Sequence, residues 1–358
     1  MKQLIVLFLC FAPFASAADY STCHSWEELK SGRDHKYATV ERLSDPGTKD
    51  QPHYNGFWFY DEQQFDRTDR YALAMRVKIR DREVTPTDVG EIGYIDLKQQ
   101  NRWTKIGETT AWNWQQGCRL QWRPRHDQIL WNDRSDDGKR FVCRLYDFHS
   151  GELRTLPRAI YDVRPDGKTA LTHDFTRMTH AGTKYVGIPD PYAQQKTPAE
   201  SGIEKVDLET GEAEFLISVQ AIAKLAFPDG YQGKTNLYVF REGWNPSGSR
   251  FIAFLRNLDR PRHISGWSIA PDGSDIRFFY RYPSHHVWMD DVTILEGDRF
   301  RMYRDDGSGK RIGNLAPVGD NTDPTILPQP YEDWILGDTY VIDGYQHLFL
   351  FHRPTKQF

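Results

Sequence analysis

Side chains that can exchange protons or neutralise an anion recur next to short apolar segments that lie far apart in this chain. They are His53 and Tyr54, Gln115 and Gln116, Arg241 and Glu242, His285 and His286, and Asp323. Imidazole and carboxyl groups transfer protons near neutral pH, and a guanidinium binds a carboxylate through two hydrogen bonds. Such groups suit β-elimination on a uronic-acid polymer. That reaction needs a neutralised carboxylate, a base for the adjacent proton and an acid at the leaving oxygen.

We assign candidate catalytic roles to four of these and neighbouring residues. His53 or His285 is the expected base, Arg241 or a cation is expected to neutralise the substrate carboxylate, and Tyr185 is the candidate proton donor. Neighbouring residues of a strand point to opposite faces, so His285 is expected to face inward and His286 to pack between sheets. A purely structural role for these histidines remains the alternative.

Glu242, His285 and Asp323 are the candidate ligands of a divalent cation, manganese or calcium. Carboxylate oxygens and imidazole nitrogens are suitable ligands for such ions. Alternatively, Arg241 and Glu242 form a structural ion pair between neighbouring sheets, which contributes little when it is exposed.

A long insertion between Asp174 and Gly202 interrupts the strand pattern. Long loops in compact domains are often functional lids. We expect this loop to cover a substrate, with Arg177 binding an anion and Tyr192 stacking on a sugar. Alternatively, the loop is a solvent-exposed segment without a function in binding. The expected substrate-binding residues are Tyr54, Trp112, Gln115, Gln116, Arg177 and Tyr192.

An internal repeat must position these side chains. The clearest copy, residues 163–171, reads Val-Arg-Pro-Asp-Gly-Lys-Thr-Ala-Leu, a tight turn followed by an apolar run. This pattern is typical of a turn between two antiparallel strands, and a repeat decides the fold class first. The other copies lie at residues 65–73, 122–130, 244–252, 288–295 and 329–336, so six units are visible.

A second repeated phrase, at residues 94–98, 145–153 and 205–212, places an aspartate at the end of a strand before a polar turn. Each unit therefore reads as four antiparallel strands, which predicts an all-β fold, a β-propeller of four-stranded blades. A β-sandwich is the alternative. The last unit lacks a fourth strand, and residues 37–43 are expected to supply it. The one helical pattern covers residues 216–225.

The ends and the composition narrow the class of protein. Residues 1–17 have the pattern of a secretory signal peptide, residues 18–36 read as a linker, and residues 37–358 as the propeller. We therefore expect an exported protein, periplasmic or extracellular, that is monomeric and not inserted in a membrane. A formal net charge of −4 argues against nucleic acid as a partner. Cys118 and Cys143 fall on non-adjacent strands of one unit and are expected to be free, buried thiols.

Several stretches resemble a bacterial group of exported propellers that includes oligogalacturonate lyase and the Tol-system propeller. They are residues 108–122, 131–134, 284–288, 338–340 and 344–348. The run Ala-Trp-Asn-Trp-Gln-Gln-Gly at residues 111–117 is the most specific of them. The resemblance implies a propeller that acts on or binds an acidic oligo- or polysaccharide, as a polysaccharide lyase or as a noncatalytic binding protein of a glycan or a protein.

Two departures from that group bear on its chemistry. The resemblance implies seven blades and a metal held by histidines, but Arg241 and Glu242 stand where the group has Asn-His, and Asp323 stands where it has His. The chain also ends where a seventh blade would begin. The histidine metal site therefore cannot be carried over intact.

Overall fold

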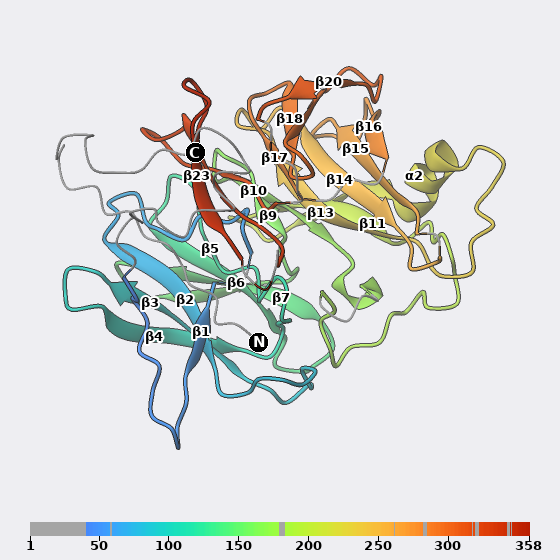
Figure 1. Ribbon diagram of the computed structural model, residues 1–358. Helices are drawn as coiled ribbons and strands as arrows, with labels where there is room; N and C mark the ends of the chain where they lie inside the picture. Colours follow the sequence, from blue (N-terminus) through green and yellow to red (C-terminus); the bar gives the residue numbers. More distant parts are fainter. Residues whose placement is uncertain are drawn as a thin grey trace. The chain divides into compact units, whose positions relative to one another are not determined.

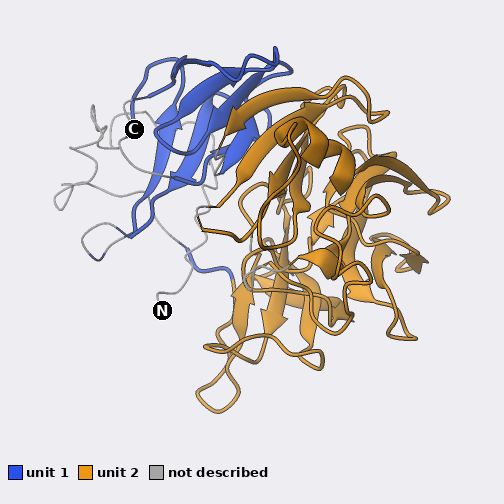
Figure 2. Ribbon diagram, turned by 90° about the vertical axis from the view of Figure 1, so that its right-hand side faces the viewer, with its two compact units in different colours: residues 1–43, 283–358 blue, residues 44–282 orange. Residues whose placement is uncertain are grey.

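The computed structural model describes residues 41–57, 59–178, 183–260, 262–281, 285–316, 318, 322–341, 344 and 346–358. These residues form six antiparallel sheets, in which successive strands of the chain are neighbours (Figure 1). Five sheets have four strands and the last has three. The fold is the predicted six-bladed β-propeller. The chain divides into two compact units, coloured separately in Figure 2, and each is described by itself.

Unit 2, residues 44–282, holds four blades. Their strands are β1 (Tyr54–Gly56), β2 (Tyr71–Val77), β3 (Gly90–Asp96) and β4 (Arg102–Thr109); β5 (Gln121–Trp122), β6 (Gln128–Arg134), β7 (Phe141–Asp147) and β8 (Leu153–Leu156); β9 (Asp162–Val163), β10 (Thr169–His173), β11 (Gly202–Asp207) and β12 (Ala213–Ser218); and β13 (Tyr238–Trp244), β14 (Phe251–Arg256), β15 (Ile264–Ile269) and β16 (Arg277–Arg281).

The first repeated phrase forms the turn between the first and second strands of a blade. Between β9 and β10, the Gly167 amide donates to the Arg164 carbonyl at 2.7 Å. Gly167 has φ +74°, and a Cβ there would lie 2.2 Å from the Pro124 carbonyl oxygen. Only glycine fits this turn, which explains the Pro-Asp-Gly sequence.

The second phrase forms the turn between the third and fourth strands. The Asp147 carboxylate accepts from the Ser150 amide at 2.8 Å, and Asp207 accepts from the Thr210 amide at 2.8 Å. These bonds lower the pKa of both aspartates, because they stabilise the charged form. The strand-ending aspartate is therefore a local requirement of the turn.

Apolar clusters lie between successive blades of unit 2. One joins the first two blades through residues such as Ile92 and Trp131, and another joins the third and fourth through Ile203 and Leu255. Burying one such side chain contributes about 1.5–3 kcal/mol. These clusters hold the inner strands, and thus the residues that they carry, in fixed positions.

The predicted helix is confirmed as α2 (Val219–Ala226). Its first residue follows Ser218, whose hydroxyl accepts from the Ala221 amide at 3.0 Å as an N-cap. Val219 and Ile222 are buried in the cluster of the third and fourth blades.

Unit 1, residues 1–43 and 283–358, holds two blades. They are β17 (His286–Trp288), β18 (Thr293–Glu296), β19 (Arg301–Arg304) and β20 (Arg311–Asn314), then β21 (Thr325–Ile326), β22 (Trp334–Asp338) and β23 (Leu348–His352). The last sheet has three strands in the described part of the chain, as expected.

Two predictions at the N-terminal end fall on or near undescribed residues. The signal peptide, the linker and residues 37–40 of the expected closing strand lie outside the described residues. Residues 41–43 belong to no strand. None of the described helices has the length and apolar character that a membrane span requires.

Cys118 and Cys143 are buried and free, as predicted. The Cys118 carbonyl accepts from the Asn132 amide of β6 at 2.8 Å, and Cys143 lies opposite Asn132 on β7. One strand therefore separates the two thiols, which is why they do not pair.

Candidate functional site

Five buried or half-buried ionisable residues of unit 2 form what we call the acid cluster: Glu62, Arg119, Asp162, His173 and Glu242. Glu62 follows β1, Arg119 precedes β5, Asp162 begins β9, His173 ends β10, and Glu242 lies in β13. All four blades of the unit contribute. The cluster is therefore a product of the repeat, which places the inner strands of the blades side by side.

Arg119 and Glu62 form one of the two buried pairs of the acid cluster. Arg119 Nε lies 2.7 Å from Glu62 Oε1, while its N–H donates to the Tyr161 carbonyl at 3.0 Å. The Arg119 guanidinium also lies 3.8 Å from the centroid of the Tyr161 ring. The Glu62 oxygens accept no hydrogen bond from the described residues. Burial raises the pKa of Glu62 well above its usual range, although Arg119 opposes this.

Asp162 is the one residue of the acid cluster that is half-buried, whereas the other four are buried. Its Oδ2 accepts from the Trp244 amide at 2.8 Å. Burial is the main reason that the pKa of Asp162 rises to about 7, and the nearby Asp61 and Glu242 carboxylates raise it further, against the effect of Arg119. A carboxyl with such a pKa can both take up and release a proton at neutral pH.

His173 and Glu242 form a pair between the third and fourth blades. His173 Nδ1 lies 2.8 Å from Glu242 Oε2, and neither side chain has any exposed surface. The imidazole also packs 4.3 Å from the Phe175 ring. His173 Nε2 and Glu242 Oε1 have no hydrogen-bond partner among the described residues. Buried polar atoms without partners are rare, and they often mark a functional or hydrated site.

Arg241 lies at an irregularity of β13. The register with β14 shifts between Phe240 and Gly243, and Arg241 has φ +58°. Its guanidinium carbon lies 5.0 Å from the centroid of the Phe59 ring and 5.8 Å from that of Phe240. The bulge re-aims this side chain, a common device at functional sites. The expected partner of Arg241, Glu242, instead contacts His173.

The structure places two residues of the expected substrate loop in the core. Tyr185 is 1% exposed, its ring stacks 4.7 Å from Phe175, and its hydroxyl accepts from Asn132 Nδ2 at 3.2 Å. Burial raises the pKa of Tyr185 well above its usual range. This position does not suit a proton donor to a substrate.

Arg177 organises the loop instead of facing a ligand. It lies in the short 3-10 helix η1 (Phe175–Arg177), is 1% exposed, and donates to the Leu237 carbonyl at 2.6 Å and the Gln195 carbonyl at 2.6 Å. Its Nη1 also donates to the Tyr192 carbonyl at 3.1 Å. The Arg177 guanidinium already donates its hydrogen bonds to protein acceptors, so it does not suit the expected role in anion binding. Tyr192 is half-buried.

The remaining expected binding residues differ in access. Trp112 is fully buried and donates to the Asp88 carbonyl at 2.9 Å, and Gln116 is buried and donates to the Tyr161 hydroxyl at 2.8 Å. Both are structural in this position. Gln115 and Tyr54 are half-buried.

The two expected bases lie in different units. In unit 2, the His53 side chain is 24% exposed, and its Nδ1 lies 3.7 Å from Asp45 Oδ2. In unit 1, His285 contacts the Asp323 carboxylate through Nδ1. Burial, followed by repulsion from Asp323, raises the pKa of Asp338 to about 7. We call His285, Asp323 and Asp338 the unit 1 cluster.

The expected metal ligands are only partly brought together. His285 and Asp323 are in contact, whereas Glu242 belongs to unit 2 and pairs with His173. Across the described ranges, no group of three or more His, Cys, Asp or Glu side chains is arranged to hold a metal ion. These residues therefore do not fit the expected manganese or calcium site.

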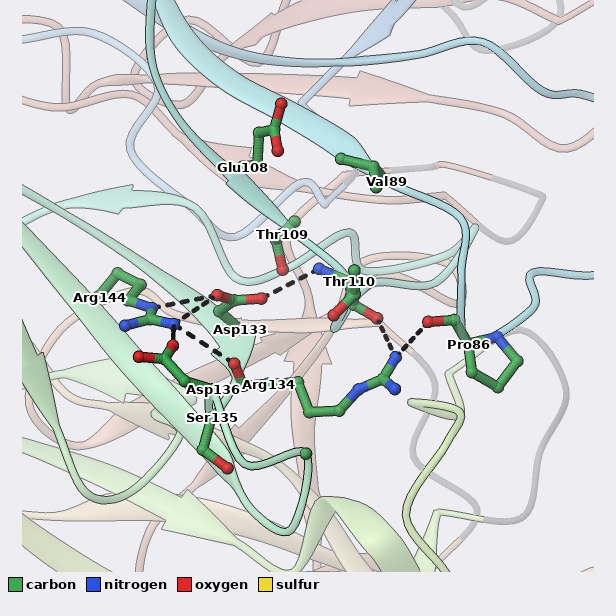
Figure 3. Close-up of a pocket in the computed structure, with 11 residues that line it drawn as sticks. Pro86, Val89, Glu108, Thr109, Thr110, Asp133, Arg134, Ser135, Asp136 and Arg144 are labelled. Atoms are coloured by element: carbon green, nitrogen blue, oxygen red, sulfur yellow. Dashed lines mark hydrogen bonds and ion pairs between the residues drawn. The ribbon is translucent and has the colours of Figure 1, made fainter.

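A surface cavity of about 340 Å³ lies between the first two blades of unit 2 (Figure 3). Arg144 Nε donates to Asp133 at 3.0 Å, its Nη2 donates to Asp136 at 2.8 Å, and Arg134 donates to the Pro86 carbonyl at 2.5 Å. Arg144 is therefore already engaged with Asp133 and Asp136, and Arg134 with a backbone carbonyl. The acid cluster is thus the stronger candidate site.

Sequence reasoning missed Glu62, Arg119, Asp162 and His173. One signal for Asp162 was present, because it directly precedes the Val-Arg-Pro-Asp-Gly phrase and so enters a first strand, like the other candidates. No sequence pattern marks Glu62, Arg119 or His173, whose importance depends on their burial beside charges from other blades.

Comparisons with known proteins bear on the fold. No family model and no curated protein matches this sequence. Oligogalacturonate lyase in complex with manganese is similar in structure, with a TM-score of 0.43 and 15% identity over 86% of this chain and 91% of that chain. TolB from Acinetobacter baumannii has a TM-score of 0.43 and 14% identity over 81% and 62%. The β-propeller domain of the Trilobed protease from Pyrococcus furiosus has a TM-score of 0.47 and 10% identity over 82% and 80%. The expected likeness to the lyase and Tol-system propellers is confirmed, and at this identity it concerns the fold alone.

Proposed function

We propose that this protein cleaves an acidic, uronate-containing glycan by β-elimination, and that the acid cluster of unit 2 carries out the proton transfers. The observation that carries the proposal is the Asp162 carboxyl at the start of β9, which has a pKa of about 7 and lies near enough to the Arg119 guanidinium to be influenced by it. The guanidinium carbons of Arg119 and Arg241 lie 5.7 Å and 5.0 Å from the centroid of one ring, that of Phe59.

The proposed reaction divides between two residues. Arg241 neutralises the substrate carboxylate, which lowers the energy of the negative charge that develops beside it. Ionised Asp162 removes the proton from the carbon next to that carboxylate, and the electron pair of the broken C–H bond becomes the new carbon–carbon double bond. The C–O bond to the leaving sugar breaks, and protonated Asp162 returns its proton to the leaving oxygen. One carboxyl with a pKa near 7 suits both steps.

We derive no step through a divalent cation, because the described residues do not gather a set of ligands for one. His53 and His285 stay in the proposal as alternative bases, since both are less deeply embedded than His173. The expected setting is an exported, monomeric protein that meets acidic polysaccharide in the periplasm or outside the cell.

The test is an assay of the full chain on polygalacturonate, glucuronan and ulvan, following the unsaturated product by its absorbance at about 235 nm. We expect the wild type to release product from at least one polymer. Asp162→Asn is expected to lose activity, and His53→Ala and His285→Ala report on the alternative bases. Asp136→Asn is the matched control, since the Asp136 side chain is 90% exposed. No product from any polymer, with and without manganese or calcium, would refute the proposal.

A noncatalytic propeller that binds a glycan or a protein is the second candidate. The observation that favours it is the close internal pairing of the acid cluster, in which Arg119 contacts Glu62 and His173 contacts Glu242 with almost no exposed surface. Buried ion pairs of this kind can have a purely structural role, in which they hold neighbouring blades together. Binding of polygalacturonate without product in the same assay would favour this candidate.

A further inference from the structure

The face of the fourth blade that carries Tyr238, Phe240 and Arg256 brings two guanidinium groups to one aromatic ring. Tyr238 lies opposite Arg256 in the pairing of β13 with β14. The Arg256 guanidinium carbon lies 5.4 Å from the centroid of the Phe240 ring, and that of Arg241 lies 5.8 Å from the same ring. Two guanidinium groups therefore share one aromatic side chain. We call Tyr238, Phe240, Arg241 and Arg256 the arginine face.

Polar atoms of this face lack partners. Tyr238 is 1% exposed, and its hydroxyl has no hydrogen-bond partner in the described part of the chain; the buried Arg256 Nε also has none. Burial raises the pKa of Tyr238 to about 12. Burial also lowers the pKa of Arg256, and the nearby Arg262 and Arg241 charges lower it further against the effect of Tyr238.

Arg256 is half-buried, and the more deeply buried arginines of unit 2 are compensated differently. Arg119 contacts Glu62, and Arg123 Nη2 donates to Glu209 at 2.5 Å. Arg177 is surrounded by carbonyl oxygens and Asp190. No carboxylate contacts Arg256 among the residues that the structure describes, although a desolvated charge without a counter-ion is costly. An anionic ligand would supply the missing partner.

We propose that the arginine face binds the carboxylate of a uronate residue, with the Arg256 guanidinium and the Tyr238 hydroxyl as donors. A guanidinium donates two parallel hydrogen bonds to a carboxylate, and such charge-assisted bonds are strong in a desolvated site. Arg241 connects this face to the acid cluster, because its neighbour in β13 is Glu242. The assignment to a sugar rests on the proposed function, whereas the oxyanion chemistry rests on the arginine face itself.

Thermal stability and calorimetric binding test the proposal with the full chain at constant ionic strength. Galacturonate is the probe, galactose is its neutral counterpart, and sulfate and phosphate are the competing oxyanions. We expect galacturonate to bind and to raise the melting temperature of the wild type, because a ligand that binds only the folded state stabilises it. Galactose is expected to do neither.

Variants locate the site. Arg256→Gln is expected to weaken galacturonate binding by about tenfold or more, and Tyr238→Phe by a few-fold, since charge-assisted hydrogen bonds contribute more than neutral ones. Arg277→Gln is the matched control, because Arg277 lies in the same blade and its Nε donates to Asp275 at 3.1 Å. Arg256→Lys retains the positive charge but cannot donate two parallel hydrogen bonds to a carboxylate. This variant replaces Arg256→Gln in the test if Arg256→Gln fails to fold.

The outcomes separate this proposal from the proposed function. Galacturonate binding that is retained in Asp162→Asn but lost in Arg256→Gln supports the arginine face even if no polymer is cleaved. Equal binding by the wild type and both Arg256 variants would overturn it. A response to sulfate or phosphate without one to galacturonate would overturn the assignment to a sugar carboxylate.

Discussion

The acid cluster of unit 2 and the unit 1 cluster each contain a carboxyl with a pKa of about 7, but the charges around the two carboxyls differ. Burial dominates in both. Around Asp162, the remaining influences oppose one another, since Arg119 lowers the pKa while Asp61 and Glu242 raise it. Around Asp338, repulsion from Asp323 raises the pKa further and backbone hydrogen bonds lower it, but no guanidinium is among the causes. A near-neutral pKa alone therefore does not mark a catalytic site, and neighbouring guanidinium groups distinguish the unit 2 cluster.

The largest expected difference between the clusters is in turnover. Asp162→Asn is expected to reduce turnover of an acidic glycan by about 10²–10⁴-fold, the usual contribution of a general acid or base. Asp338→Asn is expected to leave turnover within a few-fold of the wild type, because the proposed reaction does not use it. Initial rates of product formation measure both. A larger loss in Asp338→Asn would transfer the proposed site to unit 1.

Removal of one histidine from each cluster is expected to affect stability unequally. His173→Ala leaves Glu242 buried without its partner, which we expect to lower the free energy of unfolding by about 3–5 kcal/mol. His285→Ala leaves Asp323, whose side chain is 28% exposed and therefore hydrated, so we expect a loss of about 1 kcal/mol. Denaturant unfolding monitored by tryptophan fluorescence gives both values. Equal losses would contradict this difference and show that the two histidines contribute equally to the free energy of unfolding.

A third expected difference is in the pH dependence of stability. Asp162 and Asp338 have pKa values raised from 3.8 to about 7, so the folded protein holds protons that the unfolded chain has released. The free energy of unfolding should therefore fall as the pH rises from about 4 to about 7, and level off above that range. Asp162→Asn or Asp338→Asn should each reduce this slope.

A further variant separates the two carboxyls in that pH experiment. Asp323→Asn is expected to reduce the contribution of Asp338 to the pH dependence of stability, because repulsion from Asp323 is part of the cause of the raised pKa of Asp338. The contribution of Asp162 is expected to stay unchanged. Unfolding curves at half-unit steps of pH provide the measurement. An unchanged slope in all three variants would contradict the raised pKa values.

The sequence by itself determined the features that depend on neighbouring residues. Gly167 and Asp147 each satisfy a turn within a few residues, so their repeated phrases predicted the strands, the four-stranded blades and the six units. The spacing of Cys118 and Cys143 likewise predicted free thiols. Local steric and hydrogen-bond requirements of this kind leave a pattern that can be read along the chain.

Only the tertiary structure decided which polar residues share a site. Tyr185 and Arg177 have side chains that suit a substrate loop, yet packing against Phe175 and capture by backbone carbonyls place them in the core. Conversely, the pairing of His173 with Glu242 joins two blades and leaves no pattern in either segment. Burial and long-range electrostatics depend on which chain segments meet in space, and the spacing of residues along one chain does not encode that directly.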